Sequence, residues 1–245
     1  SEEAYIDVNE KLRIFTSKII FEPNDIKRVL IITNCTMEKN VNWLLVTKLL
    51  ESKGLSIPTF DLENEEVYRK VLRSFVKPAK EMYLGTFRFI KKIKDVLRKN
   101  GVDVDIIIIS ARYGVIDAET PIIPYEATLK KLKGYELQLW ARRRKVIEKL
   151  KSIITSGKYD LIIVSLPRSY IRPIKKIIRL LLGNPKAILL LPSTKIVEKP
   201  SQQDIVKATV IHTGNLIRRI EFLNLLRIYF EQLFMKQRTL DEYID

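Results

Sequence analysis

The sequence predicts a three-layer α/β fold, in which a mainly parallel central sheet of four to five strands is flanked by helices. Runs of β-branched and aliphatic residues at 29–33, 104–109, 161–164 and 187–191 are typical of strands that are buried on both faces. Segments with helical periodicity separate these runs. Because helices that alternate with wholly apolar strands form right-handed crossovers, we expect the strands to be parallel.

The helices are indicated by the spacing of apolar residues and by the residues that follow them. The pattern predicts helices over 41–49, 65–76, 87–100, 135–154, 169–182 and 216–235. Gly101 and Gly157 stand where a helix commonly ends, and Pro78 stops the second helix. The order of strands and helices therefore fits repeated β-α-β units.

The two ends of the chain are predicted to add edge elements to a single domain over 1–245. Apolar and polar residues nearly alternate around Leu12 and Ile14, so residues 1–24 are expected to form an N-terminal edge strand or hairpin. The core is then 25–191. Residues 192–245 are expected to supply a loop, an edge strand at 205–211 and the last helix. The loop is equally well interpreted as a mobile flap or as a plain connection.

Composition excludes several classes of protein. Hydrophobic residues make up 46% of the 245 residues, which is enough for a real core. No apolar run approaches the roughly 20 residues of a membrane helix, and no secretory pattern opens the chain, so we expect a cytoplasmic protein with no membrane partner. One cysteine (Cys35) and one histidine (His212) are too few for a zinc site, and we expect no metal or cofactor.

The composition also bears on the source of the protein. A high content of Lys, Glu and Ile with little Cys favours a thermophilic source.

The charge of the chain indicates a polyanionic partner. Lys and Arg total 44 against 29 Asp and Glu, a formal net charge of +15. Nucleic acid, DNA or RNA, is the commonest soluble polyanion and is the partner that we expect. The alternative is that the excess reflects solubility or a general preference for lysine.

A basic ridge is predicted along the helix over 169–182. Arg168, Arg172, Lys175 and Arg179 recur at steps of four, three and four, with Lys176 beside them. These five side chains are our candidates for contact with nucleic-acid phosphates. The alternative is the ordinary solvated face of a helix.

Polar side chains follow three of the predicted strands, at the edge where ligands bind in open parallel sheets. The candidate catalytic residues are Cys35, Lys39, Ser110 and Tyr113. The candidate ligand contacts are Asn34, Thr36, Arg112, Gly114, Tyr125, Ser165 and Tyr170. We expect these side chains to face one cavity, which would bind a nucleotide or a nucleobase.

Two of these segments have alternative explanations. If a helix starts after Cys35, its N–H groups and the Lys39 ammonium would lower the thiol pKa and could hold an anion. Alternatively, Cys35 is a small apolar filler and Lys39 a surface charge; the segment lacks the glycines of a phosphate loop. Gly114 predicts a tight turn that aims Tyr113 across the strand ends, although Tyr113 could instead cap the core.

Four short motifs carry a resemblance to a known group of proteins. They are Cys-Thr-Met-Glu-Lys at 35–39, Met-Tyr-Leu-Gly-Thr-Phe at 82–87, Ser-Ala-Arg-Tyr-Gly-Val at 110–115 and Pro-Tyr-Glu-Ala-Thr-Leu at 124–129. In this order they resemble an uncharacterised domain family marked by Cys-Ser-x-x-Lys and Ser-Ala-Lys-Tyr-Gly. Thr36 and Arg112 depart from that pattern, and Arg112 keeps the charge but changes the donor geometry.

The resemblance also extends more distantly. Trp140 and the segment 165–170 stand in the order seen in the YaaA family of peroxide-stress proteins, which is associated with DNA binding, and residues 35–39 are similar to the archaeosine synthase core. The resemblance implies that Cys35, Lys39, Ser110, Tyr113, Gly114 and Tyr125 share a site. It implies no particular reaction.

Three functions fit these observations. The first is a nucleic-acid-associated protein whose pocket receives a base or nucleotide, in nucleic-acid modification or stress protection. The second is an enzyme acting on a free nucleotide or modified nucleobase, with Cys35 or Ser110 as nucleophile, Lys39 or Arg112 stabilising negative charge and Tyr113 as acid or stacking wall. The third is a non-catalytic module that binds an acidic protein.

Overall fold

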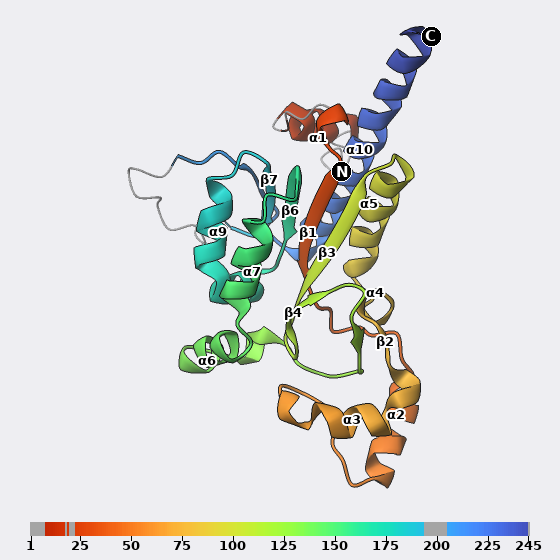
Figure 1. The fold of residues 1–245 in the computed structure, drawn as a ribbon, viewed down its shortest axis with the longest axis vertical. Coiled ribbons are helices and arrows are strands. Elements are labelled where there is room, and N and C mark those ends of the chain that lie inside the picture. The colour runs from red at the N-terminus through yellow and green to blue at the C-terminus, as the bar shows by residue number, and fades with distance from the viewer. Residues whose placement is uncertain (1–7, 18, 20–22, 194–204, 245) are drawn as a thin grey trace, which may run out of the picture.

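A computed structural model of the chain describes residues 8–17, 19, 23–193 and 205–244, and over these residues the fold is a three-layer α/β fold (Figure 1). The central sheet has the strand order β4-β3-β1-β6-β7-β8. Its strands are β1 (Arg28–Asn34), β3 (Asp103–Ser110), β4 (Gly114–Asp117), β6 (Leu161–Ser165), β7 (Ala187–Leu191) and β8 (Thr209–His212). Neighbouring strands are parallel, except that β4 is antiparallel to β3.

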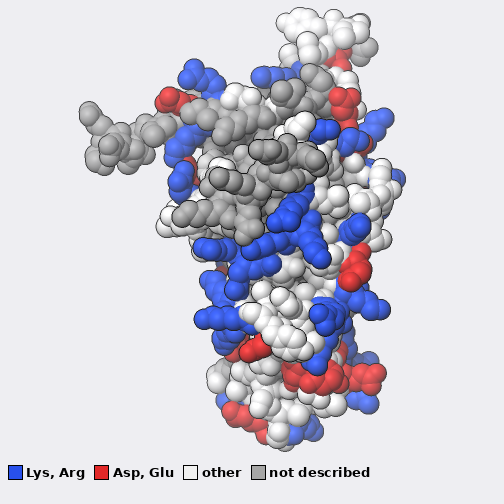
Figure 2. Space-filling view, turned by 90° about the vertical axis from the view of Figure 1, so that its left-hand side faces the viewer, with Lys and Arg blue, Asp and Glu red and all other residues white. Residues whose placement is uncertain are grey.

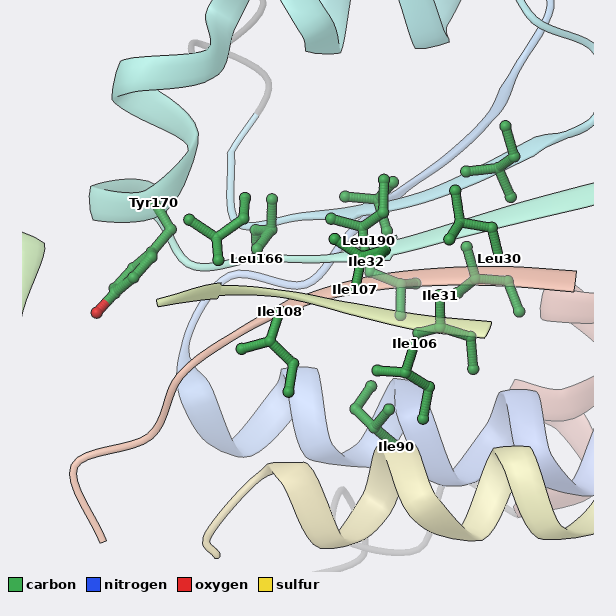
Figure 3. Packing of buried hydrophobic residues seen from close by; sticks show 14 of the residues in the cluster. Leu30, Ile31, Ile32, Ile90, Ile106, Ile107, Ile108, Leu166, Tyr170 and Leu190 are labelled. Carbon is green, nitrogen blue, oxygen red and sulfur yellow. The ribbon is translucent and has the colours of Figure 1, made fainter. Parts of the chain in front are cut away.

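Helices cover both faces of this sheet. On one face α5 (Phe87–Lys99) packs against α10 (Leu216–Ile244), and on the other α7 (Val146–Ile154) packs against α9 (Lys175–Leu182). Figure 3 shows the side chains of Ile106 and Ile108 pointing toward the α5 layer, where Ile90 lies, whereas Leu190 points to the opposite layer. Strands buried on both faces explain why the apolar runs are continuous. No helix in the described parts of the chain has the length and apolar character that crossing a membrane requires.

The remaining elements lie mostly around the ends of the strands. They are α1 (Val8–Ser17), α2 (Trp43–Ser52), α3 (Glu65–Val71), α4 (Ala79–Met82), α6 (Tyr135–Arg143), α8 (Arg168–Ile171) and an antiparallel pair, β2 (Lys77–Pro78) and β5 (Pro121–Ile122). Helices α2 and α3 lie beyond the carboxyl ends of the central strands (Figure 1). A small second core, which includes Val46, Leu50 and Leu72, joins them.

The prediction of an N-terminal edge strand or hairpin is wrong for residues 8–17, which form helix α1. Helix α1 lies against α10, and Lys11 pairs with Glu221 there. In contact with α10 the segment is a helix, although its apolar and polar residues nearly alternate. Residues 1–7, 18 and 20–22 lie outside the described residues.

Other elements differ from the prediction at particular residues. The described sheet has six strands where four to five were expected, and the strand that was not predicted is β4, which begins at Gly114 directly after the turn that follows β3. The helix expected over 135–154 is interrupted where Lys145 adopts a φ of 50°. Pro173 lies in a 3-10 turn that separates α8 from α9. Most of the loop expected at 192–203 lies outside the described residues.

Candidate functional site

A cavity of about 550 Å³ lies at the carboxyl ends of four parallel strands. The crossover from β1 to β3 passes over the face that carries α5, and the one from β6 to β7 passes over the face that carries α9. The strands β1 and β6 are neighbours, so the crossovers that follow them leave toward opposite faces of the sheet and open a crevice between them. Open α/β sheets bind ligands in such a crevice. The cavity is lined by the segments that follow β1, β6, β7 and β8.

Several polar atoms in the cavity wall are buried and unused. Among the described residues, Asn34 Oδ1, Ser169 Oγ, Thr213 Oγ1 and Arg219 Nε and Nη1 have no hydrogen-bond partner. Buried polar atoms in folded proteins are nearly always hydrogen-bonded. Four unsatisfied side chains from three strand exits and the last helix therefore point to a polar ligand in this cavity.

Arg219 is the most unusual of these residues. Its side chain comes from the start of α10 and is only 7% exposed, and one guanidinium nitrogen donates to Thr86 Oγ1 at 3.4 Å. Burial lowers the pKa of Arg219 to about 10, and no carboxylate in the described part of the chain forms an ion pair with it. A buried cation without a counter-ion is costly, so an anionic ligand would fit this end of the cavity.

Cys35 and Tyr170 join the exits of β1 and β6. The Cys35 Sγ atom lies 3.0 Å from the Tyr170 hydroxyl and 3.4 Å from the Ala111 amide, which points at the sulfur. Figure 3 shows Tyr170 beyond the ends of the strands. Burial raises the pKa of Tyr170 above its usual value, and the nearby Cys35 adds to this effect. Both residues line the cavity.

Behind this pair lies a buried cluster of hydroxyl groups with one lysine. The Tyr125 hydroxyl lies 2.8 Å from Ser110 Oγ and 2.6 Å from the Tyr83 hydroxyl. Lys39 Nζ lies 4.5 Å from the centroid of the Tyr125 ring and donates to the Thr36 carbonyl at 2.8 Å. Burial lowers the pKa of Lys39 to about 8, although Cys35 and Glu126 act in the opposite direction.

Arg112 and Tyr113 are placed away from this cavity, which differs from the expectation that they face it. Arg112 donates to Asp61 Oδ1 at 2.8 Å and forms an ion pair with Glu65 at 2.9 Å. The Tyr113 hydroxyl donates to Glu65 Oε2 at 2.6 Å and accepts from the Ile123 amide at 3.1 Å. The tight turn into β4 sends both side chains toward the first residue of α3 and the segment before it. They hold that segment against the turn.

The other predicted residues divide between the cavity and its surroundings. Asn34, Cys35, Thr36 and Tyr170 line the cavity, whereas Lys39, Ser110 and Tyr125 lie in the cluster behind it. Ser165 ends β6 and is buried outside the lining. Gly114 pairs with Ser110 in the β3–β4 hairpin, with a φ of 79° and with Arg144 Cβ 2.8 Å from where a Cβ would stand. The structure thus brings Cys35 and Ser110 together and turns Tyr113 away.

Sequence reasoning missed several residues of this site. Ser169, Thr213 and Arg219 line the cavity, and Tyr83 belongs to the hydroxyl cluster. Thr213 was available as a signal because it stands two residues after the predicted strand 205–211, yet it fits equally well as a helix cap. Tyr83 stands in one of the motifs that carry the family resemblance. Nothing in the pattern around Arg219 marks it.

A basic face lies beside the cavity. Arg168, Lys175, Lys176 and Arg179 are exposed along α8 and α9, as are Lys130, Lys131, Arg142 and Arg143 nearby. Figure 2 shows Lys and Arg gathered across the middle of the side of the molecule that carries these helices. Arg172 differs from the ridge that the sequence predicts, because it is half-buried and donates to the carbonyls of Leu129 and Leu132. Lys130 and Arg168 also line the cavity.

Comparison with known proteins identifies a family that matches part of the chain. Residues 70–188 match a family that is described as a family of unknown function (DUF6884). The matched region includes β3, β4, β6 and the hydroxyls of Ser110 and Tyr125, whereas Cys35 and Arg219 lie outside it. No curated protein and no solved structure matches the chain.

Proposed function

We propose that the protein binds nucleic acid across its basic face and takes one nucleotide or base into the cavity. The observation that carries this proposal is the continuity of the two surfaces, since Lys130 and Arg168 belong to both. Phosphates held by exposed lysine and arginine side chains would position the chain, and the cavity would receive one unit of it. A volume of about 550 Å³ is in the range of small-molecule sites.

Salt dependence tests the basic face. The variant Lys175→Glu/Lys176→Glu should bind a short oligonucleotide at least about tenfold more weakly, because it replaces two phosphate contacts by repulsion. The slope of log affinity against log salt should become shallower by about 0.9 for each duplex phosphate contact that is lost. Fluorescence anisotropy over a salt series measures both quantities.

The matched control is Lys48→Glu/Lys53→Glu, which makes the same change in charge on and just after α2, at the far end of the molecule. This control should bind within about twofold of the parent, since only long-range screened charge is altered. Equal weakening in both variants would show that net charge and not the basic face drives binding. The proposal would then be wrong.

A second candidate function is an enzyme that acts on a nucleotide or modified nucleobase. It is favoured by Lys39, a buried amine whose pKa is near 8 and which lies close to a thiol and to phenols. Such an amine is partly neutral at physiological pH and can act as base or nucleophile. Cys35→Ala should abolish turnover of the substrate without lowering the melting temperature by more than a few degrees; full activity in this variant would exclude a chemical role for the thiol.

A further inference from the structure

We propose that the end of the cavity formed by Thr213 and Arg219 binds a phosphate monoester, so that the protein recognises the phosphorylated end of a nucleic-acid strand. This inference rests on the proposed function and deepens it. The recognised chemistry is a terminal phosphate. It could be carried by a strand end or by a free nucleoside monophosphate, and the experiment below separates these sources.

The first argument is the unused hydrogen-bonding capacity of Arg219. Its guanidinium group donates one hydrogen bond, to Thr86, and leaves Nε and Nη1 without a partner among the described residues. Thr213 is fully buried, and its hydroxyl is unsatisfied in the described structure as well. A guanidinium group presents a planar set of donors that matches two oxygens of a phosphate group.

The second argument is the arrangement of two long helices. Gly85 and Thr86 precede α5, and Gly214 and Asn215 precede α10, and all four line the cavity. The first amides of α5, from Phe87 to Phe89, already donate to carbonyls of residues 84–86, and in α10 the Arg218 amide donates to Asn215 Oδ1. What the two helix starts contribute is the positive potential of their dipoles. Two helix N-termini therefore favour negative charge at the place where the buried Arg219 already does.

The third argument concerns the charges that would oppose an anion. Among the described residues that line the cavity, the one carboxylate is Glu38, and it pairs with Arg88 at 3.1 Å. Arg219, in contrast, has no acidic partner in the described structure. The net charge at this end of the cavity is thus positive before any ligand binds.

The terminal position of the phosphate follows from burial. Arg219 is 7% exposed, so an anion reaches its guanidinium group only by entering the cavity. An internal phosphodiester is flanked by sugars on both sides, whereas a phosphate monoester has a free end and three terminal oxygens. The unused donors of Arg219 and the Thr213 hydroxyl suit that larger number of acceptors. A strand that lies on the basic face could place such an end in the cavity past Lys130 and Arg168.

The experiment compares oligonucleotides of one sequence that carry a 5′-phosphate, a 3′-phosphate or no terminal phosphate. Wild-type protein should bind one phosphorylated form about tenfold or more tightly than the unphosphorylated form, as expected for charge-assisted hydrogen bonds. Arg219→Met should remove this preference, so that this variant binds the phosphorylated and unphosphorylated oligonucleotides with affinities within about twofold of each other. Arg218→Met, which removes an exposed charge next to Arg219, should keep the preference.

Further outcomes separate this inference from the proposed function. If wild type binds all three oligonucleotides equally, the phosphate site is excluded while nucleic-acid binding stands. If no oligonucleotide binds, but adenosine monophosphate or inorganic phosphate raises the melting temperature of wild type and not of Arg219→Met, the phosphate site stands with a free ligand and nucleic-acid binding falls. If none of these probes has an effect, both proposals are overturned. A melting curve of unliganded Arg219→Met establishes that the variant is folded.

Discussion

Arg112→Ala should lower the free energy of unfolding by about 3–5 kcal/mol, the usual cost of removing one partner from a buried ion pair. The Arg112 side chain is 0% exposed and contacts both Asp61 and Glu65. Its removal leaves two mostly buried carboxylates without their cation. The segment before α3 would lose its main attachment to the turn after β3. Equilibrium unfolding in denaturant measures the loss.

A matched control compares the buried ion pair between Arg112 and Glu65 with a more exposed ion pair that the same Glu65 carboxylate forms. Arg69 pairs with Glu65 Oε2 at 3.0 Å, but its side chain is 38% exposed. Arg69→Ala should therefore cost no more than about 1 kcal/mol. If Arg112→Ala costs as little as this control, the network is not a structural anchor. The expectation that Arg112 contacts the ligand would then regain support.

Acid titration tests the same network in a second way. Burial alone would raise the pKa of Asp61, but hydrogen bonds from the Thr59 amide, the Asn64 side chain and the Arg112 guanidinium lower it to about 2. A depressed carboxyl pKa stabilises the fold above the unfolded value of 3.8, and this stabilisation is lost as pH falls from about 4 toward 2. It amounts to about 2 kcal/mol. Arg112→Ala should show a smaller loss over this range.

The central strands were predictable because a strand buried on both faces needs nothing but apolar residues. Residues 106–109 and 161–164 are wholly apolar and buried, as strands covered on both faces by helices require. Residues 8–17 were not predictable in this way. Their apolar positions fit a strand and a helix about equally, and only contact with α10, far away in the chain, decides between them.

The position of the site was predictable from the parallel strands, but only some of the residues that form it were. A parallel sheet brings the segments after β1 and β6 together, which places Cys35 beside Tyr170. The segment after β3 behaves differently, since the chain turns back at once into β4 and carries Arg112 and Tyr113 away from the cavity. Arg219 depends on how α10 packs across the sheet, and no short pattern encodes that.

The structure divides the polar residues into two neighbouring groups with different chemistry. The group at Arg219 and Thr213 is open to the cavity and unsatisfied, which suits binding of an anion. The group at Lys39, Ser110 and Tyr125 is hydrogen-bonded and buried, which suits control of protonation. Cys35 lines the same cavity as the first group and is close enough to Lys39 to act on its pKa.

Lys39 should make the protein more stable as pH rises from about 8 to 10. Its pKa is lowered from 10.5 to about 8 by burial, so in this window the unfolded chain binds a proton that the folded chain does not. Stability then increases with pH by up to about 1.4 kcal/mol per pH unit, or about 2–3 kcal/mol in all. Above pH 10 the effect is opposed, because burial raises the pKa of Tyr125 and of Tyr83 well above their usual value.

Lys39→Met should abolish this rise, whereas Lys48→Met, on the exposed side of α2, should keep it. Denaturant unfolding at pH 7.5, 8.5 and 9.5 gives the slope of unfolding free energy against pH for wild type and for each of the two variants. Equal slopes in wild type and Lys39→Met would mean that the Lys39 amine is charged and solvated throughout. The enzymatic candidate would then lose its base or nucleophile, because a lysine with an ordinary pKa is almost fully protonated at neutral pH. A slope that disappears with Lys39 alone would mean that the fold maintains a partly neutral amine close to the Cys35 thiol, at some cost in stability, as functional sites often do.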